Sequence, residues 1–235
     1  TRGLDCREGD MLLARGTRLG APELAVLASA GLPRADVHAD PRIMIVATGD
    51  ELVEPGQPIE GWQIRRSNSY ALRAALTLRG FPRVADDHLP DNPRVLRDRL
   101  AAHLDTHDLL VLSGGVSMGR FDHVPQALRD VGVEEVFHKV AQRPGKPMWF
   151  GVSRSGQAVF GLPGNPVSSM VSFEQFIRPA ILKMRGYRNI YRRAVQAEMT
   201  EAFKVIDLER AQTKEQLTDG AGRSVTGRAA VENLH

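Results

Sequence analysis

The sequence predicts an α/β fold, a mostly parallel, doubly wound sheet with helices on both faces. Continuous apolar runs at 43–46 and 109–112 are typical of strands that are buried on both faces. Helical patterns alternate with the strand patterns, and parallel neighbours need such helical crossovers. We expect a short N-terminal segment and a small C-terminal β unit beside this sheet.

The alternation of strand and helix patterns divides the chain into three predicted parts. Residues 1–40 are expected to be the end of an N-terminal domain or a linker, in which Pro22 opens a helix that Gly31 ends. The α/β domain covers 41–187, and 188–235 are expected to form part of a C-terminal β domain.

The α/β domain is expected to contain six strands, at 43–46, 81–85, 109–112, 135–140, 148–152 and 158–162. Helices are expected at 67–80, 91–104, 122–132 and from 166 onward. Ser67, Asp91 and Asp122 are the predicted N-caps of the first three helices. Pro179 is expected to kink the last one.

Composition and charge exclude several classes of protein. With 31 Lys+Arg against 28 Asp+Glu, the net charge of +3 suits anionic small ligands. Nucleic acid is disfavoured, because the basic residues are not interleaved with aromatics, which make up only 6% of the chain. A membrane protein is disfavoured, because no apolar run approaches the ~20 residues of a bilayer-spanning helix. The start of the chain lacks a secretory pattern and Cys6 is the only cysteine, so a cytoplasmic location is expected.

Polar clusters follow the predicted strands at the point where each strand ends. They are Thr48–Glu51, Ser113–Asp122, Lys139–Lys146 and Pro163–Asn165. Ligands of open α/β sheets bind beyond the carboxyl ends of the strands. The four clusters are therefore expected to converge on one crevice.

Small residues dominate the cluster at 113–119, which predicts a cradle for an anion. Their backbone N–H groups can approach phosphate oxygens, and a helix is expected to follow. A plain tight loop is the alternative. Gly115–Gly119 also matches the nucleophile motif G-x-S-x-G of α/β-hydrolases, but the whole stretch is predicted loop rather than a strand-to-helix turn. No P-loop or dinucleotide fingerprint is present, which disfavours kinases and dehydrogenases.

Charged residues complete the predicted site. Four carboxylates stand at strand ends, Asp50, Glu51, Asp91 and Asp122, and such groups near phosphates suit Mg²⁺. Helix capping alone is the alternative for Asp91 and Asp122. Lys139, Arg143 and Lys146 surround a proline-bracketed turn and can hold several anionic oxygens, with a solvated basic turn as the alternative.

Five motifs in order carry a resemblance to a known family: Thr48–Leu52, Ser67–Asn68, Ser113–Gly119 with Asp122, Pro144–Pro147 and Gly161–Pro166. Over about residues 7–187 the chain resembles the molybdopterin molybdenumtransferase family, which includes the E domain of gephyrin. The resemblance implies an enzyme that takes adenylated molybdopterin and molybdate, uses Mg²⁺, inserts the metal and releases AMP. An anion cradle, basic anchors and carboxylates are what this chemistry needs.

The resemblance also implies roles for individual residues. The implied catalytic residues are Glu51, Asp91, Asp122, Lys139 and Arg143, and the implied metal ligands are Asp50, Glu51 and Asp122. The implied substrate-binding residues are Thr48, Gly49, Asp50, Ser113, Gly114, Gly115, Ser117, Lys146, Pro163, Asn165 and Pro166. Arg143 stands where the family often has lysine, which keeps the charge but changes its geometry.

The same resemblance implies partners and a larger molecule. Family members are homodimers with further N-terminal domains, so this chain is expected to represent part of one, and contact with molybdopterin adenylyltransferase is a further expectation. No nucleic acid or membrane partner is expected. Two other functions stay open: a molybdopterin adenylyltransferase, and a non-catalytic binding or scaffold module of the same fold.

Overall fold

The computed structural model describes residues 6–115 and 123–192. The chain divides into two compact units, Thr1–Ile190 and Tyr191–His235, and all the elements below belong to the first. Of the C-terminal β domain expected at 188–235, residues 193–235 lie outside the described residues. The predicted domain boundaries stay predictions.

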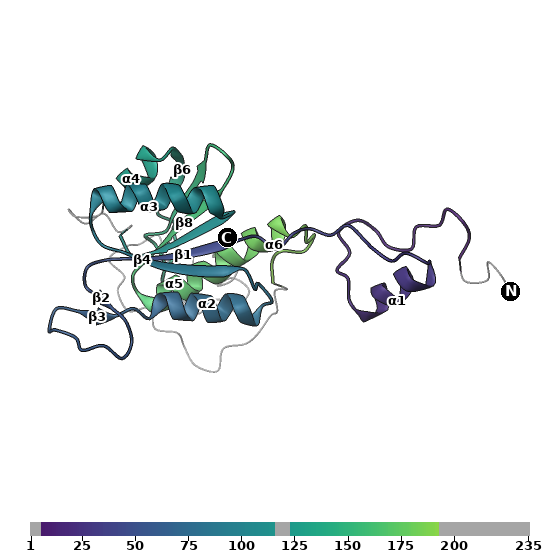
Figure 1. The fold of residues 1–235 in the computed structure, drawn as a ribbon, viewed down its shortest axis with the longest axis horizontal. Coiled ribbons are helices and arrows are strands. Elements are labelled where there is room, and N and C mark those ends of the chain that lie inside the picture. Colours follow the sequence, from purple (N-terminus) through teal and green to yellow (C-terminus); the bar gives the residue numbers. More distant parts are fainter. Residues whose placement is uncertain (1–5, 116–122, 193–235) are drawn as a thin grey trace, which may run out of the picture. The chain divides into compact units, whose positions relative to one another are not determined.

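A six-stranded sheet forms the centre of the first unit (Figure 1). In spatial order its strands are β4 (Val84–Leu89), β1 (Ile43–Thr48), β5 (Leu109–Ser113), β8 (Ala158–Leu162), β7 (Trp149–Ser153) and β6 (Val133–His138). The first four are parallel, and β7 pairs antiparallel with both β8 and β6. Because two antiparallel pairings restore the direction, β6 runs parallel to β8. Five of the six strands therefore end at the same edge.

Helices cover both faces of this sheet, which confirms the predicted fold class (Figure 1). They are α2 (Asn68–Leu78), α3 (Pro93–Thr106), α4 (Val124–Asp130), α5 (Pro166–Ser172), a π-helical turn (Phe173–Ile177) and α6 (Arg178–Met184). Outside the sheet lie α1 (Ala21–Ser29), which buries no residue, and a two-stranded ribbon of β2 (Leu52–Val53) and β3 (Ile64–Arg65).

Two apolar layers hold the helices on the sheet, because side chains alternate along β1. Met44 and Val46 pack with leucines of α3 and α4, whereas Ile43 and Ile45 pack with α2, α6 and the π turn. All residues of β1 and β5 are buried, as the sequence predicts for doubly covered strands.

Several element boundaries differ from the prediction. The strand expected at 81–85 is β4, three to four residues later, because polar residues 86–88 disguise an edge strand and Phe81 instead packs into the core before it. The strand expected at 135–140 is β6 and ends at His138, because Lys139 takes a positive φ of 72°. The strands expected at 148–152 and 158–162 are confirmed as β7 and β8, which form an antiparallel pair.

Helix ends supply further corrections. Asn92, not Asp91, caps α3, and its side-chain oxygen accepts from the backbone N–H of Arg94 and Val95. Ser67 precedes α2 as predicted but makes no side-chain capping bond. A π turn, which was not predicted, ends two residues before Pro179, and the kink expected at Pro179 stays a prediction.

An ion pair joins the amino ends of β1 and β5, on the edge opposite the predicted site. Arg42 donates from its backbone N–H (2.7 Å) and its guanidinium (2.8 Å) to the Asp108 carboxylate. These hydrogen bonds hold the pKa of Asp108 below its ordinary value of 3.8. A lowered carboxyl pKa stabilises the fold above the ordinary value, and this contribution is lost as the pH falls through the folded-state pKa.

We expect Asp108→Asn to lower the free energy of unfolding at pH 7 by less than about 1 kcal/mol, because the side chain is 39% exposed. The difference from wild type should shrink as the pH falls below 3.8. Urea unfolding at pH 7 and at several acidic pH values measures both effects. A difference that is constant over this range would contradict the assignment.

Candidate functional site

A tight turn at the end of β1 presents two of the predicted carboxylates. The backbone N–H of Leu52 donates to the carbonyl of Gly49 (3.3 Å), which makes Asp50 and Glu51 the central residues of the turn. Gly49 has a φ of 136°, and a Cβ there would stand 2.6 Å from Cδ of Glu51. The Glu51 carboxylate therefore folds back over a position that only glycine can occupy.

Asp91, after the neighbouring strand β4, joins the same cluster. Its backbone N–H donates to Oδ1 of Asp50 (3.1 Å). Because Asn92 caps α3, the Asp91 side chain is not used for capping. Three of the four predicted acidic residues thus lie at adjacent strand ends, and the fourth, Asp122, lies outside the described residues.

Small residues at the end of β5 pack directly against β1. Gly114 has a φ of 96°, and a Cβ there would stand 2.6 Å from the carbonyl oxygen of Thr48. A Cβ on Gly115 would stand 2.8 Å from Thr48 Oγ1. Thr48 Oγ1 is buried and has no hydrogen-bond partner among the described residues. Of the predicted cradle, Ser117 lies outside the described residues.

Asn68, at the start of α2, links the loops after β5 and β8. Its amide group donates to Ser113 Oγ and to the carbonyl of Gly164, both at 2.8 Å. Its Oδ1 is buried and without a partner in the described part of the chain, as is the hydroxyl of the neighbouring Ser69. The motif Ser67–Asn68 is the only sequence signal for this residue, and the pattern alone suggested no role for it.

The loop after β8 leads into α5. The carbonyl of Pro163 accepts from the hydroxyl of Ser169, and Asn165 caps the helix by accepting from the backbone N–H of Ser168 (3.0 Å). Pro166 begins the helix, where its lack of an N–H has no cost. The described geometry thus uses the Asn165 side chain for capping, while its role toward a substrate stays a prediction.

The basic turn follows β6 and is tied to the sheet by its backbone. Lys139 donates from its N–H to Met148 O (2.7 Å), and Val140 donates to Lys146 O (2.9 Å). A Cβ on Gly145 would stand 2.8 Å from the buried hydroxyl of Ser172 on α5, so the turn packs against that helix. Lys139, Arg143 and Lys146 have exposed side chains.

The predicted clusters therefore share one sheet edge but occupy different parts of it. From β1 to β6 there are four strand spacings, about 19 Å at ~4.8 Å each. Carboxylates lie toward one end, the basic turn toward the other, and the glycine cradle lies between them. This arrangement suits an extended anionic ligand better than a compact one.

The donor set fits a hard cation that is shared with a ligand. No group of three or more His, Cys, Asp or Glu side chains in residues 6–115 and 123–192 is placed to hold a metal alone. Mg²⁺ commonly takes one or two protein carboxylates and completes its shell with waters and substrate phosphates. Asp50 and Glu51 supply oxygens of this kind at the sheet edge.

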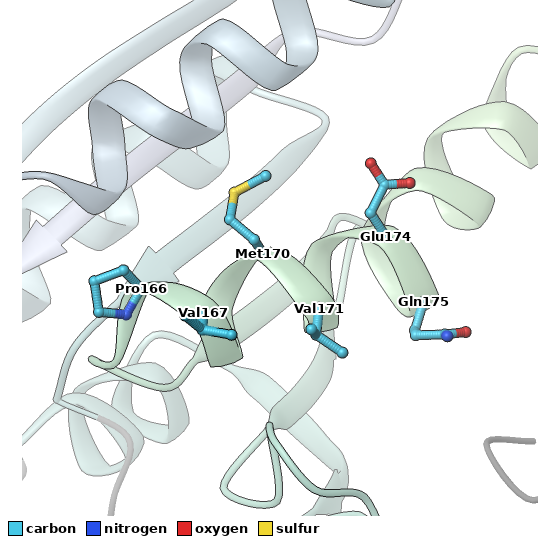
Figure 2. Close-up of a pocket in the computed structure, with 6 residues that line it drawn as sticks. All are labelled: Pro166, Val167, Met170, Val171, Glu174 and Gln175. Carbon is cyan, nitrogen blue, oxygen red and sulfur yellow. The ribbon is translucent and has the colours of Figure 1, made fainter. Parts of the chain in front are cut away.

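A shallow hollow of about 550 Å³ lies along α5 and the π turn, and the predicted substrate-binding residue Pro166 lines it (Figure 2). Figure 2 shows all six lining residues along this stretch of helix, with Met170 and Glu174 projecting to one side and Val171 and Gln175 to the other. Val167 is 63% exposed. This mostly apolar lining does not suit phosphates, so we do not assign the anionic ligand to it.

The fold is an open α/β domain with polar loops after parallel strands, which is where domains of this class bind small ligands. Residues 44–183 match the sequence profile described as "Probable molybdopterin binding domain", and the chain belongs to that family. The resemblance read from the five motifs is thereby confirmed for the family.

Individual relatives agree with this assignment. The chain is 42% identical over 174 residues to a molybdopterin molybdenumtransferase from Synechocystis, covering 73% of this chain and 44% of the relative. A protein of the same name from Haemophilus influenzae is 36% identical, and the match covers 79% of this chain and 46% of that protein. The crystal structure of a molybdopterin biosynthesis MoeA protein from Pyrococcus horikoshii matches with a TM-score of 0.66 and 30% identity. The match covers 80% of this chain and 46% of that protein. The chain spans about half the length of these relatives.

In the described residues, no helix has the length and apolar character that a membrane crossing requires.

Proposed function

We propose that this chain is the molybdopterin-binding part of a molybdopterin molybdenumtransferase, which inserts molybdate into adenylated molybdopterin and releases AMP. The observation that carries the proposal is the shared sheet edge. There the acidic turn (Gly49–Leu52), the glycine cradle (Ser113–Gly115) and the basic turn (Lys139–Lys146) follow one another. The names of the relatives favour this activity over adenylyl transfer.

The chemistry of each part supports a distinct role. Lys139, Arg143 and Lys146 would hold oxygens of phosphate and molybdate, because exposed cations on a rigid turn bind several oxygens at once. The backbone N–H of Gly115 would approach a phosphate, since no side chain blocks it. The N–H of Gly114 already donates to Leu162 O (3.4 Å), so Gly114 would serve the cradle by its lack of a side chain. Thr48 Oγ1 and Asn68 Oδ1 lie beside this cradle. Both are buried polar atoms that have no hydrogen-bond partner among the described residues, which supports a polar ligand there.

Mg²⁺ would be held by Asp50 and Glu51, with Asp122 as the further ligand that the resemblance implies. Bound there, it would neutralise phosphate charge and orient the ligand. Asp91 would support this Mg²⁺ site through its backbone N–H, which orients the Asp50 carboxylate. The family's homodimer, and contact with molybdopterin adenylyltransferase, belong to the same proposal, and the apolar hollow on α5 is a described surface whose chemistry suits a protein contact.

Isothermal titration of the purified chain with AMP, molybdate and Mg²⁺, singly and together, tests the proposal. We expect each ligand to bind more tightly when the others are present, because they share one site. Sulfate in place of molybdate is the matched control for a tetrahedral dianion. Absence of binding, in a chain that circular dichroism shows to be folded, would contradict the proposal for this chain.

A further inference from the structure

A histidine on the edge strand contacts the acidic turn. His88 is the fifth residue of β4 and pairs in register with Ala47 of β1. Its Nε2 lies 2.8 Å from the carbonyl oxygen of Gly49. A carbonyl can only accept, so Nε2 must carry the proton and donate. The ring is half-buried.

The carbonyl that His88 contacts is the one that closes the acidic turn. Gly49 O already accepts the N–H of Leu52 (3.3 Å), and a carbonyl oxygen has two lone pairs. One donor therefore closes the turn, and the other ties the turn to β4. The two residues between Gly49 and Leu52 are Asp50 and Glu51, so a shift of this carbonyl moves both carboxylates.

Two longer hydrogen bonds also link the turn to β4 and to the loop that follows β4. Gly49 N–H donates to Leu89 O at 3.3 Å, and Asp91 N–H reaches Asp50 at 3.1 Å. The His88 contact is shorter than either, so it is the best-formed tie between the turn and the strand.

The strand that carries His88 is itself firmly held. Oδ1 of Asp87 accepts the backbone N–H of His88 (2.9 Å), while its Oδ2 accepts from Arg99 and contacts His103 Nε2, both at 2.7 Å. Arg99 and His103 belong to α3. The backbone of His88 is thus anchored through α3 on one face of the sheet, while its ring faces the turn.

We propose that His88 is a positioning residue, which sets the acidic turn for cation binding by donating to the Gly49 carbonyl. This inference rests on the proposed function, in which Asp50 and Glu51 hold the cation. It predicts that the N–H donor, rather than the bulk of the ring, is what position 88 must supply.

Three full-chain variants test this inference: His88→Leu, which removes the donor, His88→Gln, which places an amide N–H near the same point, and His107→Leu as a distant histidine control. Mn²⁺ affinity is measured by electron paramagnetic resonance. Hydrogen exchange of segment 48–53 is measured on the same proteins, together with their thermal unfolding. Loss of one net hydrogen bond corresponds to a change of about fivefold in a dissociation constant.

We expect His88→Leu to weaken Mn²⁺ binding about fivefold and to speed exchange at 48–53, while His88→Gln stays near wild type in both. His107→Leu should change neither. Wild-type Mn²⁺ affinity and exchange in His88→Leu would overturn the inference. So would equal losses in His88→Leu and His88→Gln, because ring packing would then explain them.

Failure of the proposed function is distinguishable from failure of this inference. If wild type binds no Mn²⁺, the cation part of the proposed function fails. The exchange measurement then decides on His88 alone: faster exchange in His88→Leu, restored by His88→Gln, supports the contact, and unchanged exchange overturns it.

Discussion

Glu51→Gln is expected to weaken Mg²⁺ binding by about 100-fold or more. Loss of a partner that only orients a ligand typically costs 10–100-fold in metal affinity, and a direct ligand should cost at least as much. Glutamine keeps the shape of the side chain that folds back over Gly49 but removes its charge. The measurement is isothermal titration with Mg²⁺ in the presence of AMP and molybdate.

Glu60→Gln is the matched control for this variant. Glu60 is an exposed carboxylate that accepts from the indole N–H of Trp62, in the segment between β2 and β3. We expect its removal to leave Mg²⁺ affinity unchanged. If Glu51→Gln binds Mg²⁺ as wild type does, or if both variants weaken equally, the acidic turn is not the cation site.

Gly114→Ala is expected to lower the free energy of unfolding by about 3 kcal/mol or more and to abolish ligand binding. Its φ of 96° is strained for any residue with a Cβ, at a cost of about 1–3 kcal/mol. The added methyl would also stand 2.6 Å from Thr48 O, a backbone atom of a fully buried strand that cannot move away cheaply. Urea unfolding measures the loss.

The control variant Gly156→Ala separates the backbone strain of an alanine at positive φ from the close contact with Thr48 O. Gly156 has a similar φ of 89° in the turn between β7 and β8, but a Cβ there would meet nothing within 4 Å. We expect it to show only the conformational cost, about 1–2 kcal/mol, with ligand binding intact. Equal losses in the two variants would refute the close packing of the β5 loop on β1.

Much of this fold could be predicted because its central strands are apolar throughout. The runs 43–46 and 109–112 became β1 and β5, whose burial on both faces requires the helices that the sequence also predicts. The position of the edge strand β4 was predicted incorrectly, because its residues Asp86 and Asp87 are charged. They form ion pairs with Arg66 and Arg99, and a search for apolar strand patterns does not detect such pairs.

The cap of α3 shows a local rule that would have given the right residue. Pro93 is the first residue of the helix, and proline favours that first position. The N-cap must then be the residue directly before it, Asn92, although Asp91 has an equally suitable side chain. This correction matters for the site, because it leaves Asp91 beside the acidic turn.

The candidate site could be predicted loop by loop but not as an arrangement. The order of the strands along the chain does not reveal that β7 and then β6 lie beyond β8 in the sheet. This arrangement places the basic turn four strand spacings from the acidic turn. The contacts of His88 with Gly49 and of Asn68 with Ser113 join residues 39 and 45 positions apart. Such contacts depend on strand order, which local patterns do not encode.

Mapping the ligands on the isotope-labelled chain by nuclear magnetic resonance tests the central claim most directly. Saturating AMP, molybdate and Mg²⁺ should shift backbone amides at 48–51, 113–115, 139–143, 145–146 and at Gly164, in the loops that share the sheet edge. The amide resonances of Val167 and Val171, in the apolar hollow, should not shift. Shifts gathered along that hollow, with the sheet-edge loops unmoved, would contradict the assignment of the binding site.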